Sequence, residues 1–473
     1  MALQRKIASI NLTTKKIELT DIPAEWRRNY IGGQGLAAFL LHHYAPPGCD
    51  PLSPENPVII SAGIMGGTIG IPATQTCITT KSPLTNACLS VFLDGHFASE
   101  LRWAGFDHLV ITGKAKRPVY LLVQDGTVGI QDASGLRGCG TGETQRAVRD
   151  RLHDQEIQIL TTGSAGEKRV RFAHVLSSIK RTTDRPGAGA VFGAKNLKAV
   201  ACRGGLDIEI KHADEAILCG RRIIKAIRKM ENKRSKNTAT TPATPAPYQE
   251  TANEYGIDLE TTGALVDWVR TLYTHRILER KQVSRVIPES GAADPLLHLI
   301  QGIADRKGLG DILAEGPLKA SESFGGDCLR YYTNGKSRLY ATVCLQNRAE
   351  NVPSDILTQL YTDRALGCLG IPPRYHWLLQ PKHAAHEDFL ELIRLNTGTA
   401  VSYRKLRKVA KRCVIVEQLF NRREGISPDT GAAGAALFGS GDWDSQGVPT
   451  DRILEKLNIT ELRQPRFSGR SGT

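Results

Sequence analysis

The ten cysteines of this 473-residue sequence lack the spacings that build local metal sites. No two of them are separated by only two or three residues; they occur at positions 49, 77, 88, 139, 202, 219, 328, 344, 368 and 413. Zinc and iron–sulfur sites commonly draw on such closely spaced pairs. The cysteines are also too sparse for a disulfide scaffold, so we expect most of them to be reduced and buried thiols.

Long apolar runs and aromatic side chains are scarce as well. No run reaches the length of a transmembrane helix, and Met1 to Lys6 lead into polar alternation where a signal peptide has an apolar core. We therefore expect a cytoplasmic protein without a membrane partner. Aromatic residues make up only 6% of the chain, which leaves few platforms for stacking bases and disfavours a nucleic-acid partner.

Positive charge, by contrast, is in excess. Lys and Arg number 62 against 48 Asp and Glu, for a formal net charge of +14. This balance favours acidic partners, which include an acidic electron carrier and phosphorylated cofactors. With 41% hydrophobic and 23% charged residues over this length, the chain is predicted to fold into two or three globular domains.

The first two hundred residues show the patterns of short strands. Alternating apolar residues predict a β-hairpin over residues 5–20, with Thr13 to Lys16 as its polar turn. Further strands are expected at 57–63, 77–80, 108–112 and 119–123. Gly33-x-Gly35-x-x-Ala38 spells a dinucleotide-binding fingerprint. Such a site requires a buried strand directly before the first glycine, and because Trp26 to Tyr30 precede it, we reject NAD binding.

A glycine-rich, basic stretch runs from Thr162 to Val200. It contains five glycines with five basic residues among them: Gly163, Gly166, Gly187, Gly189 and Gly193, and Arg169, Arg171, Lys180, Arg181 and Arg185. Glycine lets backbone N–H groups approach a ligand closely, and such donors beside guanidinium groups suit a multiply charged anion such as phosphate. An ordinary tight turn on a basic surface explains the same composition.

Segments that match in register carry a family resemblance. AGEKRVRFAHVLSS, RPGAGAVFGAKNLKAVACRG, TKSPLT and LRWAGFDHLVITGKAKRPVYL resemble the first domain of the aldehyde:ferredoxin oxidoreductase family. Those enzymes oxidise aldehydes or related carbonyls, and they hold tungsten, or sometimes molybdenum, between two pyranopterin dithiolenes beside an iron–sulfur cluster. The resemblance implies an α+β fold, with an N-terminal sheet-rich cofactor platform followed by two mainly α-helical domains. The implied domains are residues 1–205, 206–345 and 346–473.

The resemblance also implies cofactor contacts. On the platform these are Gly33, Gly35, Lys81, Arg185 and Gly187. ANEYGIDLETTG resembles the family helix whose aspartate hydrogen-bonds one pterin, which makes Asp258 the equivalent residue. In DRALGC, Asp363 matches the aspartate that binds the second pterin, and Cys368 matches the fourth cluster ligand. The residues themselves explain Asp258 equally well as the cap of the following helix, with Thr261 or Thr262 sharing that role.

Two positions on the platform depart from the family pattern. Gln75 replaces an arginine, and Phe92 stands where the family has an asparagine beside the magnesium that bridges the pterin phosphates. A phenylalanine offers no oxygen to a hard cation. We therefore expect the magnesium site to be altered or absent.

The family's cluster segment, C-x-x-C-P-x-x-C, is also missing. A Pro- and Thr-rich linker at 237–247 takes its place. Without those three thiolates we expect Cys368 to be a lone remnant and not part of a [4Fe–4S] cluster. Convergence of Cys328, Cys344 and Cys413 on it is disfavoured. The family's histidine is absent after Asn347 to Ala349, so the sequence identifies no catalytic residue.

Two basic stretches have helical patterns. Residues 221–236 interleave basic and aliphatic residues, which is typical of an amphipathic basic helix or of a solvated face. From Ser402, apolar residues at 406, 409, 410, 413, 416 and 420 predict a helix that Ser402 caps and Gly425 ends.

Three functional hypotheses follow. The first is an oxidoreductase with a tungsto- or molybdopterin centre and a lost or simplified electron path. The second is a non-catalytic paralogue, a scaffold or regulatory subunit that pairs with an active homologue. The third, a nucleic-acid binder using 221–236, rests on charge alone. Either a homo-oligomer or a hetero-oligomer is expected, with a two-fold dimer as the default.

Overall fold

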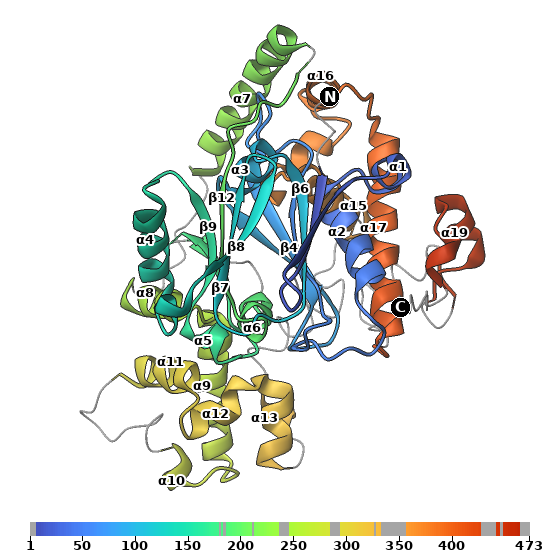
Figure 1. Cartoon of the computed structure of the whole chain (residues 1–473). Coiled ribbons are helices and arrows are strands. Elements are labelled where there is room, and N and C mark those ends of the chain that lie inside the picture. The colour runs from blue at the N-terminus through green and yellow to red at the C-terminus, as the bar shows by residue number, and fades with distance from the viewer. Residues whose placement is uncertain are drawn as a thin grey trace, which may run out of the picture.

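Two six-stranded sheets lie at the centre of the computed structural model, with groups of helices around them (Figure 1). The structure describes residues 6–178, 181–182, 186–210, 212–235, 246–283, 294–325, 328–332, 356–426, 441–444 and 448–463. A sheet-rich N-terminal part followed by helices confirms the predicted α+β class.

The first sheet has the strand order β2-β1-β6-β3-β4-β5. Its strands are β1 (Lys6–Asn11), β2 (Lys16–Asp21), β3 (Val58–Ala62), β4 (Gln75–Lys81), β5 (Cys88–Asp94) and β6 (Phe106–Thr112). All neighbours are antiparallel except β1 and β6, which are parallel. The predicted hairpin over 5–20 is therefore confirmed as β1 and β2, and the strands predicted at 57–63, 77–80 and 108–112 are confirmed as β3, β4 and β6.

The second sheet has the order β11-β10-β9-β12-β7-β8. Its strands are β7 (Val119–Gln124), β8 (Thr127–Asp132), β9 (Gln158–Thr162), β10 (Val175–Ser178), β11 (Arg181–Thr182) and β12 (Leu197–Arg203). One hydrophobic cluster combines side chains of both sheets, such as Leu109 from the first and Leu121 and Val200 from the second. Burial of these apolar faces against each other holds the two sheets together.

Short helices connect and cover the strands. They are α1 (Ala24–Tyr30), α2 (Gly33–Tyr44), α3 (Phe97–Trp103), η1 (Ser134–Leu136), α4 (Thr141–Leu152), α5 (Ser164–Glu167) and α6 (Ala188–Ala194). Helix α1 precedes Gly33 directly, where a dinucleotide-binding fingerprint requires a strand.

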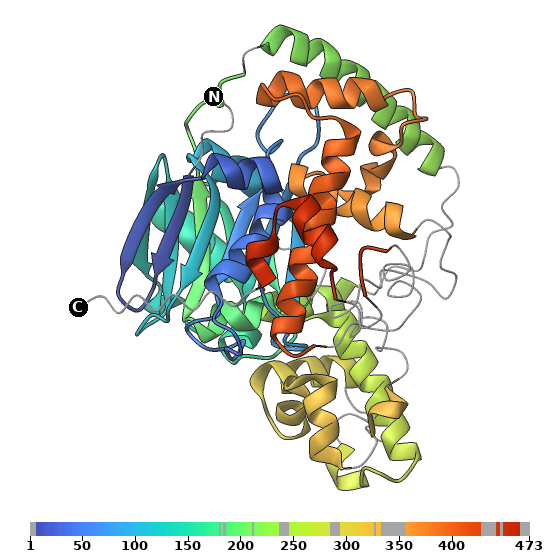
Figure 2. The ribbon, with the colours of Figure 1, turned by 90° about the vertical axis from the view of Figure 1, so that its right-hand side faces the viewer.

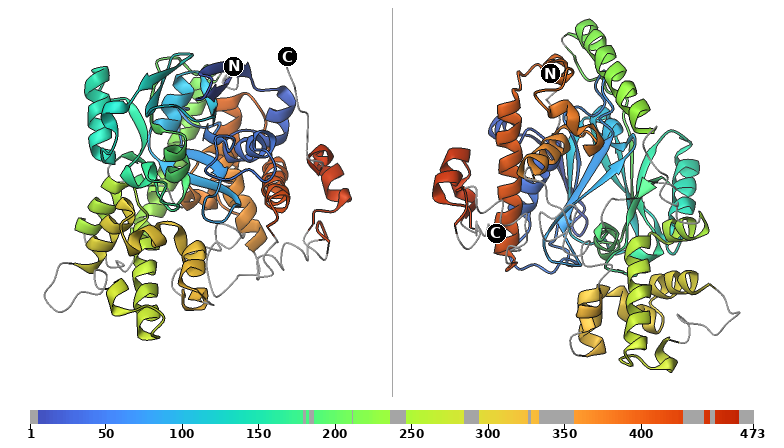
Figure 3. Two further views of the ribbon diagram at one scale, coloured as in Figure 1. Left: turned by 60° about the horizontal axis from the view of Figure 1, so that its bottom comes forward. Right: turned by 180° about the vertical axis from the view of Figure 1, so that it is seen from behind.

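The remaining helices form two groups with separate cores. One core joins α2 to α7 (Ala213–Ser235), α15 (Ile356–Leu369), η3 (Pro373–Leu379), α16 (His386–Thr397), α17 (Tyr403–Arg423), α19 (Asp451–Leu457) and η4 (Thr460–Arg463). The other joins α8 (Ala246–Tyr255), α9 (Leu259–Thr274), α10 (Arg280–Val283), α11 (Pro295–Asp305), α12 (Leu309–Ala314), α13 (Gly316–Phe324) and η2 (Cys328–Tyr331). Figures 2 and 3 show these groups on different sides of the sheets.

Both predicted basic helices are confirmed. In α17, the Ser402 side chain accepts a hydrogen bond from the Lys405 N–H, and Gly425 follows the helix with a φ of 77°. Residues 221–235 belong to α7, while most of the predicted linker, 237–245, lies outside the described residues. In the described part of the chain, no helix combines the length and the apolar character needed to cross a membrane.

One buried histidine makes stability depend on pH. His108 lies on β6, its Nδ1 2.7 Å from Ser61 Oγ, and its Nε2 has no hydrogen-bond partner among the described residues. Burial lowers the pKa of His108 from 6.5 to about 4. Between these two pH values the unfolded chain binds a proton at His108 that the folded chain does not bind. The free energy of unfolding therefore falls by about 3 kcal/mol as the pH drops through this window.

Urea denaturation at pH 7 and pH 4.5 measures this effect. We expect His108→Gln to lose much less stability on acidification than the wild type. His96→Gln serves as the control because His96 is exposed. If the wild type and His108→Gln lost the same unfolding free energy on acidification, His108 would not be the source of the pH dependence.

Candidate functional site

Asp258 lies at the start of α9 and is almost completely buried. Its Oδ2 accepts a hydrogen bond from the Thr261 N–H at 2.9 Å and another from the Thr261 hydroxyl, and Thr262 donates to its carbonyl oxygen at 2.7 Å. The predicted helix cap is therefore confirmed. Its Oδ1 lies 3.0 Å from His174 Nε2, a partner that the sequence did not indicate. The pterin contact of Asp258 stays a prediction.

Backbone contacts bring Gly187 close to this carboxylate. The segment from Arg171 to His174 runs between them, with Ala173 O accepting from the Gly187 N–H at 3.0 Å. Phe172 O accepts from the Asp258 N–H at 3.3 Å on the same segment. Gly187 has a φ of 121°, a conformation that favours glycine, and it caps α6. We call Arg171, His174, Gly187 and Asp258 the Asp258 group.

Close packing explains two other glycines of the same stretch. A Cβ on Gly193 would lie 1.8 Å from Gly166 O, so α5 and α6 can meet only where neither glycine has a side chain. For this pair the tight-packing interpretation accounts for the sequence without a phosphate. Arg185 lies outside the described residues.

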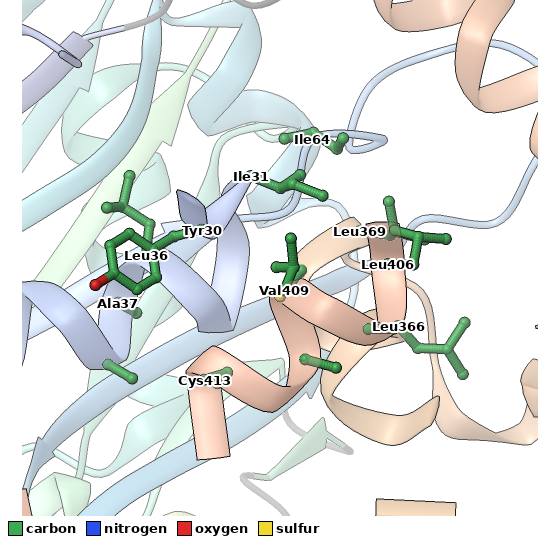
Figure 4. Packing of buried hydrophobic residues seen from close by; sticks show 14 of the residues in the cluster. Tyr30, Ile31, Leu36, Ala37, Ile64, Leu366, Leu369, Leu406, Val409 and Cys413 are labelled. Atoms are coloured by element: carbon green, nitrogen blue, oxygen red, sulfur yellow. The ribbon is translucent and has the colours of Figure 1, made fainter. Parts of the chain in front are cut away.

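Gly33 and Gly35 allow α2 to meet the end of α15. Gly33 has a φ of +48°, and a Cβ there would lie 2.3 Å from Gly367 O. A Cβ on Gly35 would lie 2.7 Å from Cys368 Sγ. Figure 4 shows the apolar side chains of α2, α15 and α17 that surround this contact. The two glycines thus have a packing role, and their cofactor role stays a prediction.

Cys368 is fully buried in this contact. Burial raises the pKa of its thiol to about 12, despite a hydrogen bond from the Gly35 backbone. Cys413 lies nearby on α17, with Sγ 3.5 Å from Glu417 Oε1. Burial, and to a smaller extent the charge of Glu417, raise the pKa of the Cys413 thiol strongly. Both cysteines are therefore neutral thiols at neutral pH.

A buried polar network surrounds the two thiols. Glu417 Oε1 accepts from Gln34 Nε2 at 3.0 Å, and Oε2 accepts from Arg364 Nη2 at 3.0 Å. Asp363 is half-buried on α15 beside Arg364, one turn and a half before Cys368. We call Gly33, Gly35, Asp363 and Cys368 the Cys368 group.

Of the other cysteines considered for a cluster, the structure places only Cys328. Cys328 belongs to the core of the α8–α13 helices, and Cys344 lies outside the described residues. Within the described ranges no group of three or more His, Cys, Asp or Glu side chains is arranged to hold a metal ion, and none of the nine cysteines there is in a disulfide. The metal role of Cys368 and the missing cluster stay predictions.

Lys81, at the end of β4, has a partner inside the protein. Its Nζ lies 2.5 Å from Glu424 Oε2 and 2.7 Å from Cys49 O. The Lys81 and Glu424 side chains are 5% and 0% exposed. The buried pair joins the first sheet to the end of α17, and 343 residues separate its members.

The hairpin of β4 and β5 connects the two groups. At its turn, Pro83 O accepts from Arg171 Nη1 at 2.8 Å. At its open end, the Gln75 N–H donates to Gly370 O at 3.0 Å, and Asp94 pairs with Arg374 at 2.9 Å. The Asp258 group and the Cys368 group therefore lie toward opposite ends of this hairpin.

The predicted cofactor fits these residues in part. Asp258 and Asp363 are hydrogen-bond acceptors, which suit the N–H groups of a pterin. Magnesium requires about six oxygen ligands. Phe92 offers none, and Asp94 contributes only Oδ1, which is buried without a hydrogen-bond partner in the described part of the chain. The altered or absent magnesium site stays a prediction.

A separate cavity of about 460 Å³ lies between α8, α9 and α11. Tyr248, Gly263 and Asp294 are among the residues that line it. It includes none of the predicted cofactor contacts.

Sequence reasoning missed the partners of the predicted residues. His174 was visible only as one residue of the RFAH segment, and Glu424 only as one residue after the long basic helix. A polar residue at the buried end of an apolar strand or helix is the signal that such a partner exists. That signal does not say which residue the partner is.

Family profiles match most of the chain. The profile described as aldehyde ferredoxin oxidoreductase, N-terminal domain, matches residues 7–204, and that of domains 2 and 3 matches residues 236–338. Together they cover more than half of the 473 residues.

Curated relatives match over a shorter span. A tungsten-containing aldehyde ferredoxin oxidoreductase of Pyrococcus furiosus is 36% identical over 219 residues, which are 46% of this chain and 36% of that protein. Its counterpart in Thermococcus kodakarensis is 35% identical over 219 residues, again 46% and 36%. An aliphatic sulfonate oxidoreductase, WOR-like subunit, of Pyrococcus furiosus is 32% identical over 218 residues, 43% and 35%. The chain thus spans little more than a third of the length of these relatives.

A solved structure shares the whole fold. A chain of the active site complex BamBC of benzoyl coenzyme A reductase, in complex with 1,5 dienoyl-CoA, aligns with a TM-score of 0.82 and 21% sequence identity. The alignment covers 98% of each chain. At this identity the likeness establishes the fold alone.

Proposed function

Because the chain belongs to the aldehyde ferredoxin oxidoreductase family, we propose that it is an oxidoreductase that binds a tungsten or molybdenum bis-pterin and acts on an aldehyde or related carbonyl. One observation carries the proposal: a positive-φ glycine and a carboxylate recur at both ends of the β4–β5 hairpin. Gly187 accompanies Asp258 at one end, and at the other Gly33 packs on Gly367 and Cys368, at the end of the helix that carries Asp363. Two groups of similar chemistry suit a cofactor with two similar halves.

In this proposal Asp258 and Asp363 hold the N–H groups of the two pterins, each on a helix that fixes its position. When bound, the metal would supply the two-electron chemistry of the carbonyl oxidation. His174 orients Asp258 through its hydrogen bond. Burial of the Asp258 carboxylate keeps water from competing for its hydrogen bonds, and Asp363 is half-buried.

The electron path is the part we propose to be simplified. A [4Fe–4S] cluster needs four thiolates, and the sequence lacks the family segment that supplies three of them. Cys368 packs on Gly35, and Cys413 is a further described thiol of the same core. Electrons would then leave to an acidic carrier or to a homologous subunit, in keeping with the net charge of +14.

Metal analysis of protein grown with tungstate and molybdate tests the proposal. We expect about one tungsten or molybdenum per chain and little iron. Asp258→Asn combined with Asp363→Asn should lower the tungsten or molybdenum content at least fivefold. Thr261→Val is the matched control, since it removes a hydroxyl from the α9 cap and leaves the carboxylate.

Cys368→Ala tests whether the electron path is simplified or contains a [4Fe–4S] cluster. It should leave the metal content unchanged. About four irons per chain, lost in this variant, would show a [4Fe–4S] cluster and contradict the simplified path.

Two of the predicted cofactor-binding residues already have partners inside the protein, and this favours a second function. Lys81 pairs with Glu424, and Asp258 pairs with His174, so both are held without a cofactor. This would suit a non-catalytic scaffold or regulatory subunit of an active homologue. Protein free of tungsten and molybdenum after growth with both metals, yet bound to such a homologue, would replace the first proposal by this one.

A further inference from the structure

Helix α7 presents two different faces. Its inner face carries Ala216, Cys219, Ile223 and Ile227, which are buried in the core shared with α16. Cys219 Sγ donates to Asp388 O at 3.1 Å, and Arg222 pairs with Asp388 at 2.7 Å. These contacts account fully for the inner face and fix the orientation of the helix.

The outer face of α7 exposes aliphatic side chains. Ile217, Leu218 and Ile224 are 39%, 56% and 37% exposed. They are three of the five large hydrophobic side chains that are exposed in the described part of the chain. Ile217 and Ile224 are seven residues apart and lie above one another on the helix, and Leu218 lies about 120° around the helix from Ile224, at the other edge of the same exposed arc. Such a concentration marks an interaction surface, because single exposed apolar residues are normally scattered.

Positive charge is concentrated on the same face. Arg221, Lys225, Arg228 and Lys229 are exposed there, and within the described residues none of them has a carboxylate partner. No acidic residue occurs from Ala216 to Met230. In Figure 1, α7 lies at the upper edge of the molecule, and Figure 3 shows it at the edge from behind. We call residues 217, 218, 221, 224, 225, 228 and 229 the α7 outer face.

We propose that the α7 outer face is the docking surface for an acidic, amphipathic helix of a partner protein. Carboxylates of the partner would pair with Arg221, Lys225 and Arg228, and its apolar side chains would cover Leu218 and Ile224 in helix-on-helix packing. The surface needs both kinds of contact, since unpaired cations and exposed aliphatic groups alternate along it.

Two other anionic occupants suit this face less well. A nucleic acid would bring phosphates and base edges against Ile217, Leu218 and Ile224, and the face has no aromatic or amide side chain to contact bases. A bilayer surface requires an apolar face that enters the headgroup region. The main apolar face of α7 is already covered by α16. This inference does not depend on cofactor binding, and it stands if the proposed function fails.

The test begins with the tagged full chain purified at low salt from its native host. Stably bound proteins are identified by mass spectrometry, and any acidic one is produced separately and titrated into the full chain by calorimetry. Two variants change the face: Arg221→Gln with Lys225→Gln and Arg228→Gln, and Leu218→Asp alone. The matched control is Arg404→Gln with Arg407→Gln and Lys408→Gln, which removes the same charge from the exposed face of α17.

We expect both α7 variants to weaken binding at least tenfold, with the α17 control within twofold of the wild type and all melting temperatures alike. Vesicles with 30% phosphatidylserine and a 20-base-pair DNA duplex are titrated in parallel as probes. Binding of either probe that is lost only in the α7 variants would overturn the proposal in favour of a lipid or nucleic-acid surface. A partner that binds both α7 variants as tightly as the wild type, or no acidic partner at all, would also overturn it.

Discussion

Arg102→Met should lower the free energy of unfolding by about 3–5 kcal/mol, because it leaves a buried carboxylate without its main partner. Arg102 Nε lies 3.1 Å from Asp107 Oδ1, and both side chains are buried. Arg27 holds the other oxygen at 3.0 Å. Burial would raise the pKa of Asp107, but the guanidinium groups of Arg102 and Arg27 outweigh it and hold the pKa below its usual value. Asp107 is therefore charged in the wild-type protein, and in the variant it keeps the Arg27 guanidinium group.

Arg102→Met should also increase the local opening of a loop that Arg102 binds. Arg102 Nη1 donates to Ile64 O at 2.5 Å and to Gly66 O at 2.9 Å. The loop that it holds contacts the end of α15, where Met65 N donates to Leu369 O at 3.1 Å. We expect faster amide exchange in residues 63–67 and 366–370, next to the Cys368 group.

Urea denaturation and hydrogen exchange of Arg102→Met and Arg27→Met measure both effects. Arg27 is the control because its side chain is 16% exposed and because Asp107 would keep Arg102. We expect Arg27→Met to lose much less unfolding free energy than Arg102→Met, and to show no faster amide exchange in residues 63–67. Equal losses in the two variants would show that Arg102 is not the main partner.

Glu424→Gln should also cost about 3–5 kcal/mol, since it removes the carboxylate charge that balances the buried Lys81 ammonium group. Combining it with Lys81→Met removes the uncompensated lysine charge, while Arg423, whose Nε lies 3.1 Å from Glu424 Oε1, keeps the His42 carbonyl as an acceptor. The amide oxygen introduced at position 424 can still accept from the Gly48 N–H, which Glu424 Oε2 now binds at 3.0 Å. We expect the double variant to recover most of the stability that Glu424→Gln loses.

Metal content shows whether Lys81 has a second role. If Lys81 only joins β4 to α17, the stable double variant should hold as much tungsten or molybdenum as the wild type. If it binds the cofactor, the double variant should be stable and poor in metal. A double variant as unstable as Glu424→Gln would show that the unbalanced charge of Lys81 is not the cause of the lost stability.

Local patterns in the sequence were sufficient for part of the secondary structure. Alternation identified β1 and β2, and short runs rich in apolar residues identified β3, β4, β6 and β7, because these patterns are visible within a few positions. Ser402 and Asp258 were recognisable as caps, because a cap bonds a backbone N–H within three residues. The in-register segments identified the family, and with it the α+β class.

Tertiary structure alone decided which polar groups meet. The pairs Lys81–Glu424, Gln34–Glu417 and His174–Asp258 are 343, 383 and 84 residues apart. Periodicity and capping rules act over a few residues, whereas the partner of a buried charge is whatever group the packed elements bring within about 3 Å of it. For the same reason the sequence showed that α7 is basic and amphipathic. Only its packing on α16 decided which of its aliphatic residues remain exposed beside unpaired cations.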